Sequence, residues 1–177
     1  MRVVSGKARG TKLNTLEGLD TRPTADRVKE ALFSVICEYV PESIVLDLFS
    51  GSGALAIEAL SRGADRAVLI EKNPKAGEVI RSNLEKTRLN TDAELIITDA
   101  FDFISITDRQ FDIIFLDPPY RHGLCDRAMD IIIKRNLLAE DGIIICETSI
   151  EEEIKTELAL FKEKKYGKTK FLIYKGE

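Results

Sequence analysis

Short apolar runs alternate with longer amphipathic segments along this chain, and this alternation restricts the possible folds more than any other feature. Several of the short runs are apolar throughout, which is typical of parallel strands buried on both faces. The pattern therefore predicts an α/β fold with a doubly wound, mainly parallel, Rossmann-like sheet. The predicted strands span residues 43–49, 66–71, 93–98, 111–117, 142–147 and 170–175, and the predicted helices span residues 53–62, 74–89, 123–135 and 150–161.

The size and composition of the chain favour a single domain. Its 177 residues are 44% hydrophobic, which is enough for one buried core. We expect residues 1–40 to form an extension, with a short hairpin in "RVVSGKARGTKLNTL" and an amphipathic helix from about residue 25 to residue 39. Residues 41–177 are expected to form the core that carries the functional motifs.

The sequence predicts neither a membrane segment nor a metal site. Its apolar runs are too short to span a bilayer, and "MRVVSGKARG" lacks the apolar centre of a signal peptide, so we expect a cytoplasmic protein with no membrane partner. The three cysteines lack the spacing of metal ligands. Cys37 and Cys146 lie in apolar stretches, and we expect both to pack in the core.

Charge is distributed unevenly along the chain, although the net charge is only −4. Residues 1–30 carry seven Lys/Arg against four acids, and residues 161–177 carry six against two, while the middle of the chain is acidic. Basic ends of this kind can attract nucleic-acid phosphates to an otherwise acidic domain. Solvated, lysine-rich surface segments would explain the same distribution.

The stretch "VLDLFSGSGALAIEAL" joins a predicted buried strand to a predicted helix through Gly51 and Gly53. Glycines at such a turn let the chain bend tightly and let a ligand approach bare backbone. Alone the motif is weak, because with Ala54 to Ala56 it also fits the looser dinucleotide-binding pattern. Asp47, at the end of the strand, favours a ligand ammonium group over a pyrophosphate.

Two further acids follow the next two predicted strands. Glu71 is placed to accept both hydroxyls of a ribose, and Asp99 is placed to accept an adenine amino group. Each acid taken singly could instead be a solvated strand end or a helix cap. Together they describe a ligand with an ammonium group, a ribose and an adenine, which fits S-adenosylmethionine. The residues assigned to this cofactor are Asp47, Phe49, Gly51, Gly53, Glu71, Lys72, Asp99 and Ala100.

The stretch "FLDPPY" ends the fourth predicted core strand with Asp117, Pro118, Pro119 and Tyr120. Prolines cannot continue a sheet ladder, so the strand stops there and holds the acid and the ring in fixed positions. Asp117 and a backbone carbonyl of the two prolines could accept both N–H groups of a base amine and direct its lone pair at a methyl donor. Tyr120 would stack on that base. A proline-rich turn with a surface tyrosine is the structural alternative.

At these motifs the chain resembles a class I S-adenosylmethionine-dependent methyltransferase, and specifically the bacterial family that methylates the guanine N2 amine of 16S ribosomal RNA in the small subunit. The resemblance rests on "MRVVSGKARGTKL", "TRPTADRVKEALFS", "LDLFSGSGALAIEALSRGA", "IEKNP" and "FDIIFLDPPY". It implies a seven-stranded sheet with an antiparallel last strand, for which "LFKEKKY" must supply the sixth strand. It also implies that residues 117–120 are catalytic.

The implied partner is 16S ribosomal RNA or a partly assembled small ribosomal subunit. Arg22 and Arg27 of "TRPTADRVKEALFS" could bind phosphate oxygens, as could Lys7 and Arg9 of the basic amino-terminal segment. The two arginines could instead pair with acids such as Glu30.

Three other functions remain open from the sequence. An adenine-N6 DNA methyltransferase also uses "DPPY", but 177 residues leave little room for a segment that reads duplex DNA. A nicotinamide-dependent oxidoreductase would explain the glycines and Glu71 and leave "DPPY" without a role. A non-catalytic RNA-binding scaffold would explain the basic ends of the chain and leave the acids at the strand ends without a role.

Overall fold

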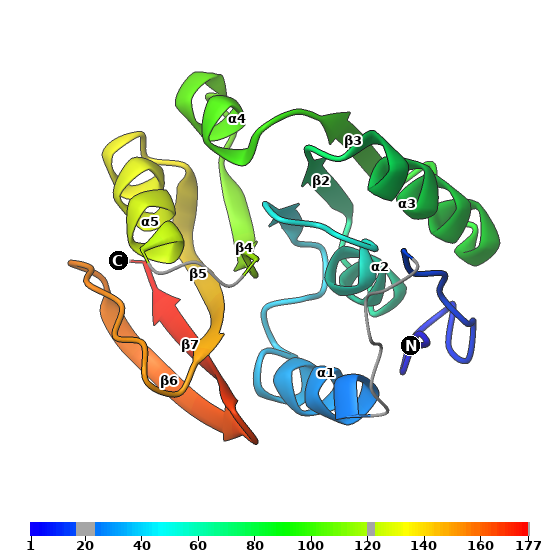
Figure 1. Cartoon of the computed structure of the whole chain (residues 1–177), viewed down its shortest axis with the longest axis horizontal. Helices are drawn as coiled ribbons and strands as arrows, with labels where there is room; N and C mark the ends of the chain where they lie inside the picture. The colour runs from blue at the N-terminus through cyan, green and yellow to red at the C-terminus, as the bar shows by residue number, and fades with distance from the viewer. Residues whose placement is uncertain (17–23, 120–122, 177) are drawn as a thin grey trace.

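The computed structural model describes residues 1–16, 24–119 and 123–176 (Figure 1). The helices are α1 (Thr24–Val35), α2 (Ala54–Ser61), α3 (Pro74–Thr87), α4 (Ala100–Ile106) and α5 (Leu124–Lys134). The strands are β1 (Ile44–Asp47), β2 (Arg66–Glu71), β3 (Ala93–Ile97), β4 (Phe111–Leu116), β5 (Leu138–Ser149), β6 (Ala159–Tyr166) and β7 (Thr169–Lys175).

These strands form one seven-stranded sheet in the order β3-β2-β1-β4-β5-β7-β6. Neighbours among β1 to β5 are parallel, whereas β7 runs antiparallel to both β5 and β6. Parallel neighbours need crossover connections, and helices supply them here. The predicted doubly wound, mainly parallel sheet is therefore confirmed, and so is the antiparallel last strand.

Helices cover both faces of the sheet, with α1, α2 and α3 on one face and α4 and α5 on the other (Figure 1). Successive residues of a central strand therefore enter different cores. On β1, Val45 packs on the side of α1 to α3 and Leu46 on the side of α4 and α5. Ile113 and Ile114 of β4 divide in the same way. Burial on both faces explains why these strands are apolar throughout.

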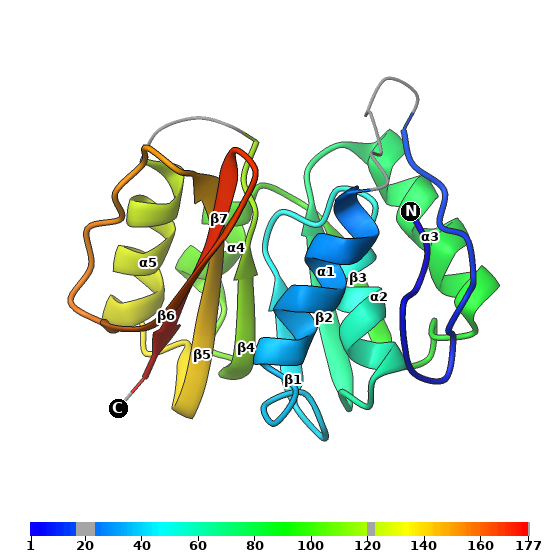
Figure 2. The same ribbon diagram turned by 90° about the horizontal axis from the view of Figure 1, so that it is seen from below.

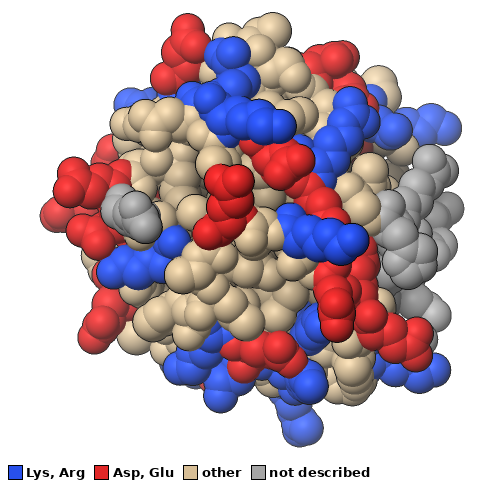
Figure 3. Space-filling model, turned by 90° about the vertical axis from the view of Figure 1, so that its left-hand side faces the viewer, with Lys and Arg blue, Asp and Glu red and all other residues tan. Residues whose placement is uncertain are grey.

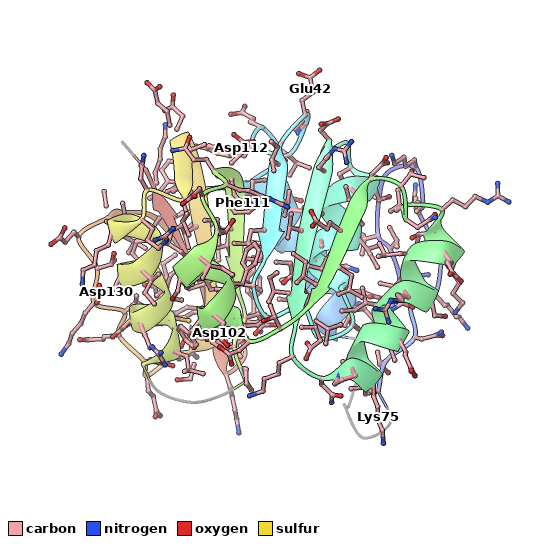
Figure 4. The ribbon with its side chains drawn as sticks, turned by 90° about the horizontal axis from the view of Figure 1, so that it is seen from above. Glu42, Lys75, Asp102, Phe111, Asp112 and Asp130 are labelled. Carbon is pink, nitrogen blue, oxygen red and sulfur yellow. The ribbon has the colours of Figure 1, made fainter. Side chains whose placement is uncertain are left out.

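The parallel strands point their carboxyl ends toward one edge of the sheet, which we call the carboxyl edge. Lys75 and Asp102, in the first turns of α3 and α4, lie at this edge, and Glu42 and Asp112 lie at the opposite, amino edge (Figure 4). Open α/β sheets bind ligands at the carboxyl edge, where the order of the strands reverses. In this sheet that point lies between β1 and β4.

The predicted helix over residues 150–161 is wrong. Residues 150–158 form turns and irregular structure, and Ala159–Tyr166 forms strand β6, which pairs antiparallel with β7. β6 is exposed along nearly its whole length, so its sequence lacks the apolar alternation that identifies a strand. Main-chain pairing with β7 determines its conformation instead. The expectation that "LFKEKKY" supplies the sixth strand is confirmed.

The cysteines are only partly where we expect them. Cys37 is exposed, because α1 ends before it and the following turn buries Ile36 and Val40 instead. The expectation that Cys37 packs in the core is therefore wrong. Cys125 and Cys146 are both buried.

An amino-terminal arm, residues 1–14, crosses the surface of the core next to α2 and α3 (Figure 2). It forms the expected hairpin, with a single antiparallel bridge between Arg2 and Lys12. The N–H of Val3 donates to the Thr11 carbonyl at 3.0 Å. One bridge is too little to hold a hairpin in water, so contacts with the core must hold the arm.

Glu58 on α2 provides the main attachment of the arm. Its fully buried carboxylate accepts the backbone N–H groups of Val4 at 2.9 Å and Ser5 at 3.0 Å. The same carboxylate pairs with Lys29 of α1 at 3.2 Å and with Arg62 at 2.7 Å. A buried charge is tolerated when donors surround it in this way. Glu58 therefore fixes both parts of the amino-terminal extension to the core.

Candidate active site

The glycine loop follows β1 at the carboxyl edge. Gly51 has φ +56° and Gly53 has φ +77°, a left-handed conformation that favours glycine. A Cβ atom on Gly51 would meet no atom within 4 Å, so the backbone faces open space there. A Cβ atom on Gly53 would approach Leu69 Cδ2 to 3.1 Å. Gly53 thus allows the loop to pack on β2, while Gly51 leaves bare backbone for a ligand.

Asp47 ends β1 directly below this loop and is 1% exposed. Its Oδ2 accepts the Ala56 N–H at 3.3 Å, while Oδ1 has no hydrogen-bond partner among the residues that the structure describes. Burial raises the pKa of Asp47 to about 7, the Ala56 N–H opposes the shift, and the charge of Glu71 adds to it. A buried carboxylate with an unused oxygen is suited to a cationic ligand group.

Glu71 ends β2 and is half-buried. Its Oε2 accepts the Gly51 N–H at 2.9 Å, and its Oε1 accepts the Asn73 N–H at 2.8 Å. Each carboxylate oxygen has a second lone pair, so both can still accept a ligand hydroxyl. Glu71 therefore shapes the glycine loop and keeps capacity for a ribose.

Asn83 is a further loop-supporting residue that the sequence analysis misses. The side chain is fully buried on α3, and its Nδ2 donates to the Ser52 carbonyl and to the Asn14 carbonyl, both at 2.9 Å. It thereby connects the glycine loop to the amino-terminal arm. The sequence signal for Asn83 is weak: it is a polar residue at a position of α3 that faces the core.

Asp99 acts as the N-cap of α4, with its side chain accepting the Phe101 N–H at 2.8 Å. The helix-cap alternative for this acid is therefore present in the structure. Helix α4 itself has seven residues, too few to show a helical period, and the sequence does not predict it. Ala100 is buried at its start and Lys72 is exposed after β2.

Aromatic side chains border the same region. Phe49, in the loop after β1, meets Phe101 edge to face with 6.2 Å between ring centroids. The guanidinium carbon of Arg127 lies 4.0 Å from the centroid of the Phe101 ring. Phe49 and Phe101 are both half-buried, so they provide apolar surface beside Asp99.

Asp117 follows β4 and lies near Asp47. Asp47 pairs with Phe115 across β1 and β4, and Asp117 follows Phe115 by two residues, directly beyond the end of β4. Loss of water around the carboxyl group, then the charges of Glu147 and Asp47, raise the pKa of Asp117 well above its ordinary value. The residue as a whole is exposed, because the chain leaves the sheet here. The charges of the Glu147 and Asp47 carboxylates therefore explain the raised pKa of Asp117 better than burial does.

The proline pair continues outward from Asp117. Pro118 is half-buried and Pro119 is exposed. Tyr120, which we expect to stack on the target base, lies outside the described residues, as does Arg22.

Glu147 is a further acid at the carboxyl edge, which the sequence analysis does not single out. It is half-buried near the end of β5, and burial raises its pKa. Its signal in the sequence is the same as for the other acids, a carboxylate that follows an apolar strand in "GIIICE".

The predicted RNA-binding residues of the extension lie at two edges. α1 begins toward the carboxyl edge, and Arg27 is exposed in its first turns (Figure 2). The turn of the arm lies toward the amino edge, where Lys7 pairs with Asp92 at 3.1 Å and Arg9 is exposed. Within the part of the chain that the structure describes, Arg27 makes no ion pair with Glu30 or another acid.

The basic carboxyl-terminal segment forms most of β6 and all of β7. The face over α5 and β6 carries acidic and basic side chains intermixed (Figure 3). Lys165 of β6 pairs with Glu163 at 3.2 Å. This mixing favours the solvated-surface interpretation of the segment over a single basic patch.

Other potential sites are few among the described ranges. Two shallow pockets lie away from the carboxyl edge, one beside Ser5 and Cys37 and one beside Arg66 and Phe111. Residues 1–16, 24–119 and 123–176 contain no cluster of three or more potential metal ligands and no helix long and apolar enough to cross a membrane. The cytoplasmic location stays a prediction.

The seven strands and the antiparallel β7 match the sheet that the resemblance to class I methyltransferases implies. The unused oxygen of Asp47 and the open backbone at Gly51 fit the ammonium group of S-adenosylmethionine better than a pyrophosphate. Fold and site together therefore define a class I S-adenosylmethionine-dependent methyltransferase.

Comparison with known proteins specifies the family within this class. The model of the family described as Conserved hypothetical protein 95 matches residues 1–175, and the chain belongs to this family. The chain is 37% identical to "Putative rRNA methyltransferase YlbH" of Bacillus subtilis, with 99% of this chain and 98% of that protein covered. It is 34% identical to "Ribosomal RNA small subunit methyltransferase D" of Haemophilus influenzae, with 99% and 94% covered.

A solved structure agrees with these relatives. "Putative methyltransferase yhhF from Escherichia coli" superposes with a TM-score of 0.89 at 33% identity, covering 100% of this chain and 98% of that chain. The resemblance inferred from the motifs is confirmed for the family, the fold and the methyltransferase class. The individual site residues stay predictions.

Proposed function

We propose that this protein transfers a methyl group from S-adenosylmethionine to the exocyclic N2 amine of a guanine in the 16S ribosomal RNA of the small subunit. The main support is the position of Asp117. It directly follows β4, the strand next to that of Asp47, and the charge of Asp47 acts on it, so an acceptor for the target amine is close to the predicted ammonium site. The names of the relatives support RNA, and specifically small-subunit RNA, as the substrate.

The chain offers acceptors for each polar part of the cofactor. Asp47 Oδ1 would bind the ammonium group, Glu71 the ribose hydroxyls, and the free lone pairs of Asp99 the adenine amine. Phe49 and Ala100 would provide apolar surface for the adenine ring. When bound, S-adenosylmethionine supplies an electrophilic methyl group on its sulfonium centre.

Asp117 would act on the target amine. The lone pair of a guanine N2 amine is delocalised into the ring, which makes the nitrogen a weak nucleophile. Asp117 and the Pro118 carbonyl would accept its two N–H groups and favour a pyramidal nitrogen with its lone pair directed out of the ring plane. As the nitrogen gains positive charge, the Asp117 carboxylate stabilises that charge and can take the released proton.

Methyl transfer assays can test this proposal. Transfer of labelled methyl groups should be measured on 16S ribosomal RNA, on small ribosomal subunits and on duplex DNA, followed by nucleoside analysis of the product. N2-methylguanosine from RNA or subunits supports the proposal. N6-methyladenine from DNA would replace it with the alternative methyltransferase, and tight NAD binding without methyl transfer would favour the oxidoreductase.

A further inference from the structure

Asp117 and Glu147 each follow the last paired residues of two neighbouring parallel strands. Leu116, the last residue of β4, pairs with Cys146 of β5; Asp117 comes directly after β4, and Glu147 is the next residue of β5. Parallel strands lie about 4.8 Å apart. Both acids are therefore within reach of one small group at the carboxyl edge.

Glu147 projects from the face of the sheet that α1 to α3 cover. Ile145, two residues earlier on β5, belongs to the core on that side, and side chains alternate along a strand. Asp117 lies just beyond β4, close enough for the charges of Glu147 and Asp47 to raise its pKa. Asp47 of β1 lies on the same face as Glu147, and its Oδ1 is buried without a partner in the described structure.

The closeness of Asp117 and Glu147 destabilises the protein when no substrate is bound. Two carboxylates at adjacent positions repel each other, and the described residues place no lysine or arginine in an ion pair with either one. Burial also raises the pKa of Glu147. Acid pairs that cost stability in this way are found mainly where a ligand supplies the missing donors.

The required ligand has two neighbouring N–H donors. In guanine the N2 amine lies next to the ring N1–H, so this edge presents donors to two acceptors. In adenine and cytosine the exocyclic amine lies next to ring nitrogens that carry only a lone pair, and a carboxylate there would be repelled. Two adjacent carboxylates therefore match guanine and reject the other two bases.

We propose that Glu147 is the residue that selects guanine, with its carboxylate accepting the N1–H while Asp117 accepts an N–H of the N2 amine. This inference rests on the proposed function, because it takes a guanine amine as the target. The two N–H donors of the base offset the repulsion between the two carboxylates. Glu147 contacts the ring N1–H and not the nitrogen that receives the methyl group. Its role is therefore to select the base, whereas Asp117 acts on the methylated amine.

A base analogue isolates this contact. The methylated guanine is first mapped by mass spectrometry in the product of the parent enzyme, and 16S RNA with 2-aminopurine at that position is then assembled into small subunits. 2-Aminopurine keeps the C2 amine but has no N1–H. The parent should methylate guanine about 10²-fold or more faster than 2-aminopurine, because a site built to bind an N–H rejects an analogue that lacks it.

Substitution of Glu147 should remove this preference. Glu147→Ala should slow methylation of guanine by a similar factor and leave 2-aminopurine nearly unchanged. Glu147→Gln keeps an acceptor oxygen and should retain much of the preference. Glu140→Ala is the matched control, because Glu140 lies on β5 but is exposed at the other end of the strand. S-adenosylmethionine binding, measured by calorimetry, should be the same in all four proteins.

The possible failures are distinguishable. If Glu147→Ala slows both substrates equally, or if the parent does not discriminate between them, the selection role of Glu147 is wrong while the proposed function stands. If the parent places no methyl group on N2 of any guanine, the proposed function itself fails. Should Glu147→Ala not fold, Glu147→Leu takes its place, because leucine fills a similar space without an acceptor oxygen and should likewise lose the preference for guanine over 2-aminopurine.

Discussion

Ala56 donates its N–H to Asp47 Oδ2 at 3.3 Å and leaves Asp47 Oδ1 without a partner in the described part of the chain. The pKa of this buried carboxyl is about 7, against an ordinary 3.8. Asp47 is therefore close to half protonated at neutral pH. Only the ionised form attracts an ammonium group.

Cofactor affinity should consequently rise between pH 5.5 and pH 7.5. As the pH rises through about 7, Asp47 ionises and becomes able to bind the ammonium group. Calorimetric titration of S-adenosylmethionine at several pH values measures the effect. Asp47→Asn should bind the cofactor weakly at every pH and lose the pH dependence. Equal affinity of the parent at pH 5.5 and pH 7.5 would contradict the assignment.

Asp47 should also lower the stability of the cofactor-free protein at high pH. A pKa raised by folding means that the folded state is favoured below about pH 4, and that this advantage is lost as the pH rises through about 7. The loss is on the order of 4 kcal/mol. Asp47→Asn should therefore raise the thermal midpoint more at pH 8 than at pH 5. A similar change at both pH values would show that Asp47 is already ionised at low pH.

Gly51→Ala should fold and yet bind cofactor poorly. The left-handed backbone at Gly51 costs an alanine about 1 kcal/mol, and the new methyl group would enter the open space over the loop. Gly10→Ala is a matched control, since Gly10 also has a positive φ and open space but lies on the arm. Both variants should lose similar stability in urea unfolding. Only Gly51→Ala should lose affinity for S-adenosylmethionine, and equal affinities would place the cofactor elsewhere.

Asp117→Ala should reduce single-turnover methylation by about 10² to 10⁴ while cofactor affinity is retained. The carboxylate acts mostly in the transition state, when the amine nitrogen gains positive charge. Asp117→Asn keeps an acceptor oxygen and should be faster than the alanine variant. Asp130→Ala, at an exposed position on α5, should equal the parent (Figure 4). An alanine variant at position 117 that is as fast as the parent would remove Asp117 from the mechanism.

Glu58→Ala should reduce the free energy of unfolding by about 3 to 5 kcal/mol, because it leaves the buried charge of Lys29 without its partner. Burial already lowers the pKa of Lys29, against the pull of Glu58. Urea unfolding measures the loss, and limited proteolysis should show release of the amino-terminal arm. Glu163→Ala breaks the exposed pair with Lys165 and should cost less than about 1 kcal/mol. If Glu58→Ala and Glu163→Ala lost equal free energy of unfolding, Glu58 would not be the residue that holds the arm.

Arg27→Glu should weaken RNA binding more than Arg9→Glu. Both arginines are exposed, but Arg27 lies in the part of α1 that is nearer the carboxyl edge (Figure 2). Loss of a phosphate contact should also reduce the salt dependence of binding. Binding measured at several salt concentrations compares the two variants. A larger effect of Arg9→Glu would place the RNA across the arm instead.

Local sequence features predict much of this fold. Short, continuously apolar runs identify the central strands, because burial on both faces leaves no polar positions. The glycine turn after β1 is likewise local, since a turn depends on a few neighbouring residues. Strand β6 escapes prediction because its exposed residues carry no pattern and its conformation depends on pairing with β7.

The sequence by itself determined that acids follow successive apolar strands, because each acid and its strand are adjacent in the chain. It did not determine which acids are neighbours. Asp47, Asp117 and Glu147 are far apart in sequence, and only the strand order β1-β4-β5 brings them together at one edge of the sheet. That order results from non-local pairing and from the packing of helices on both faces, which no local pattern encodes. The chemistry of each residue is therefore local, whereas the site that combines them exists only in the folded sheet.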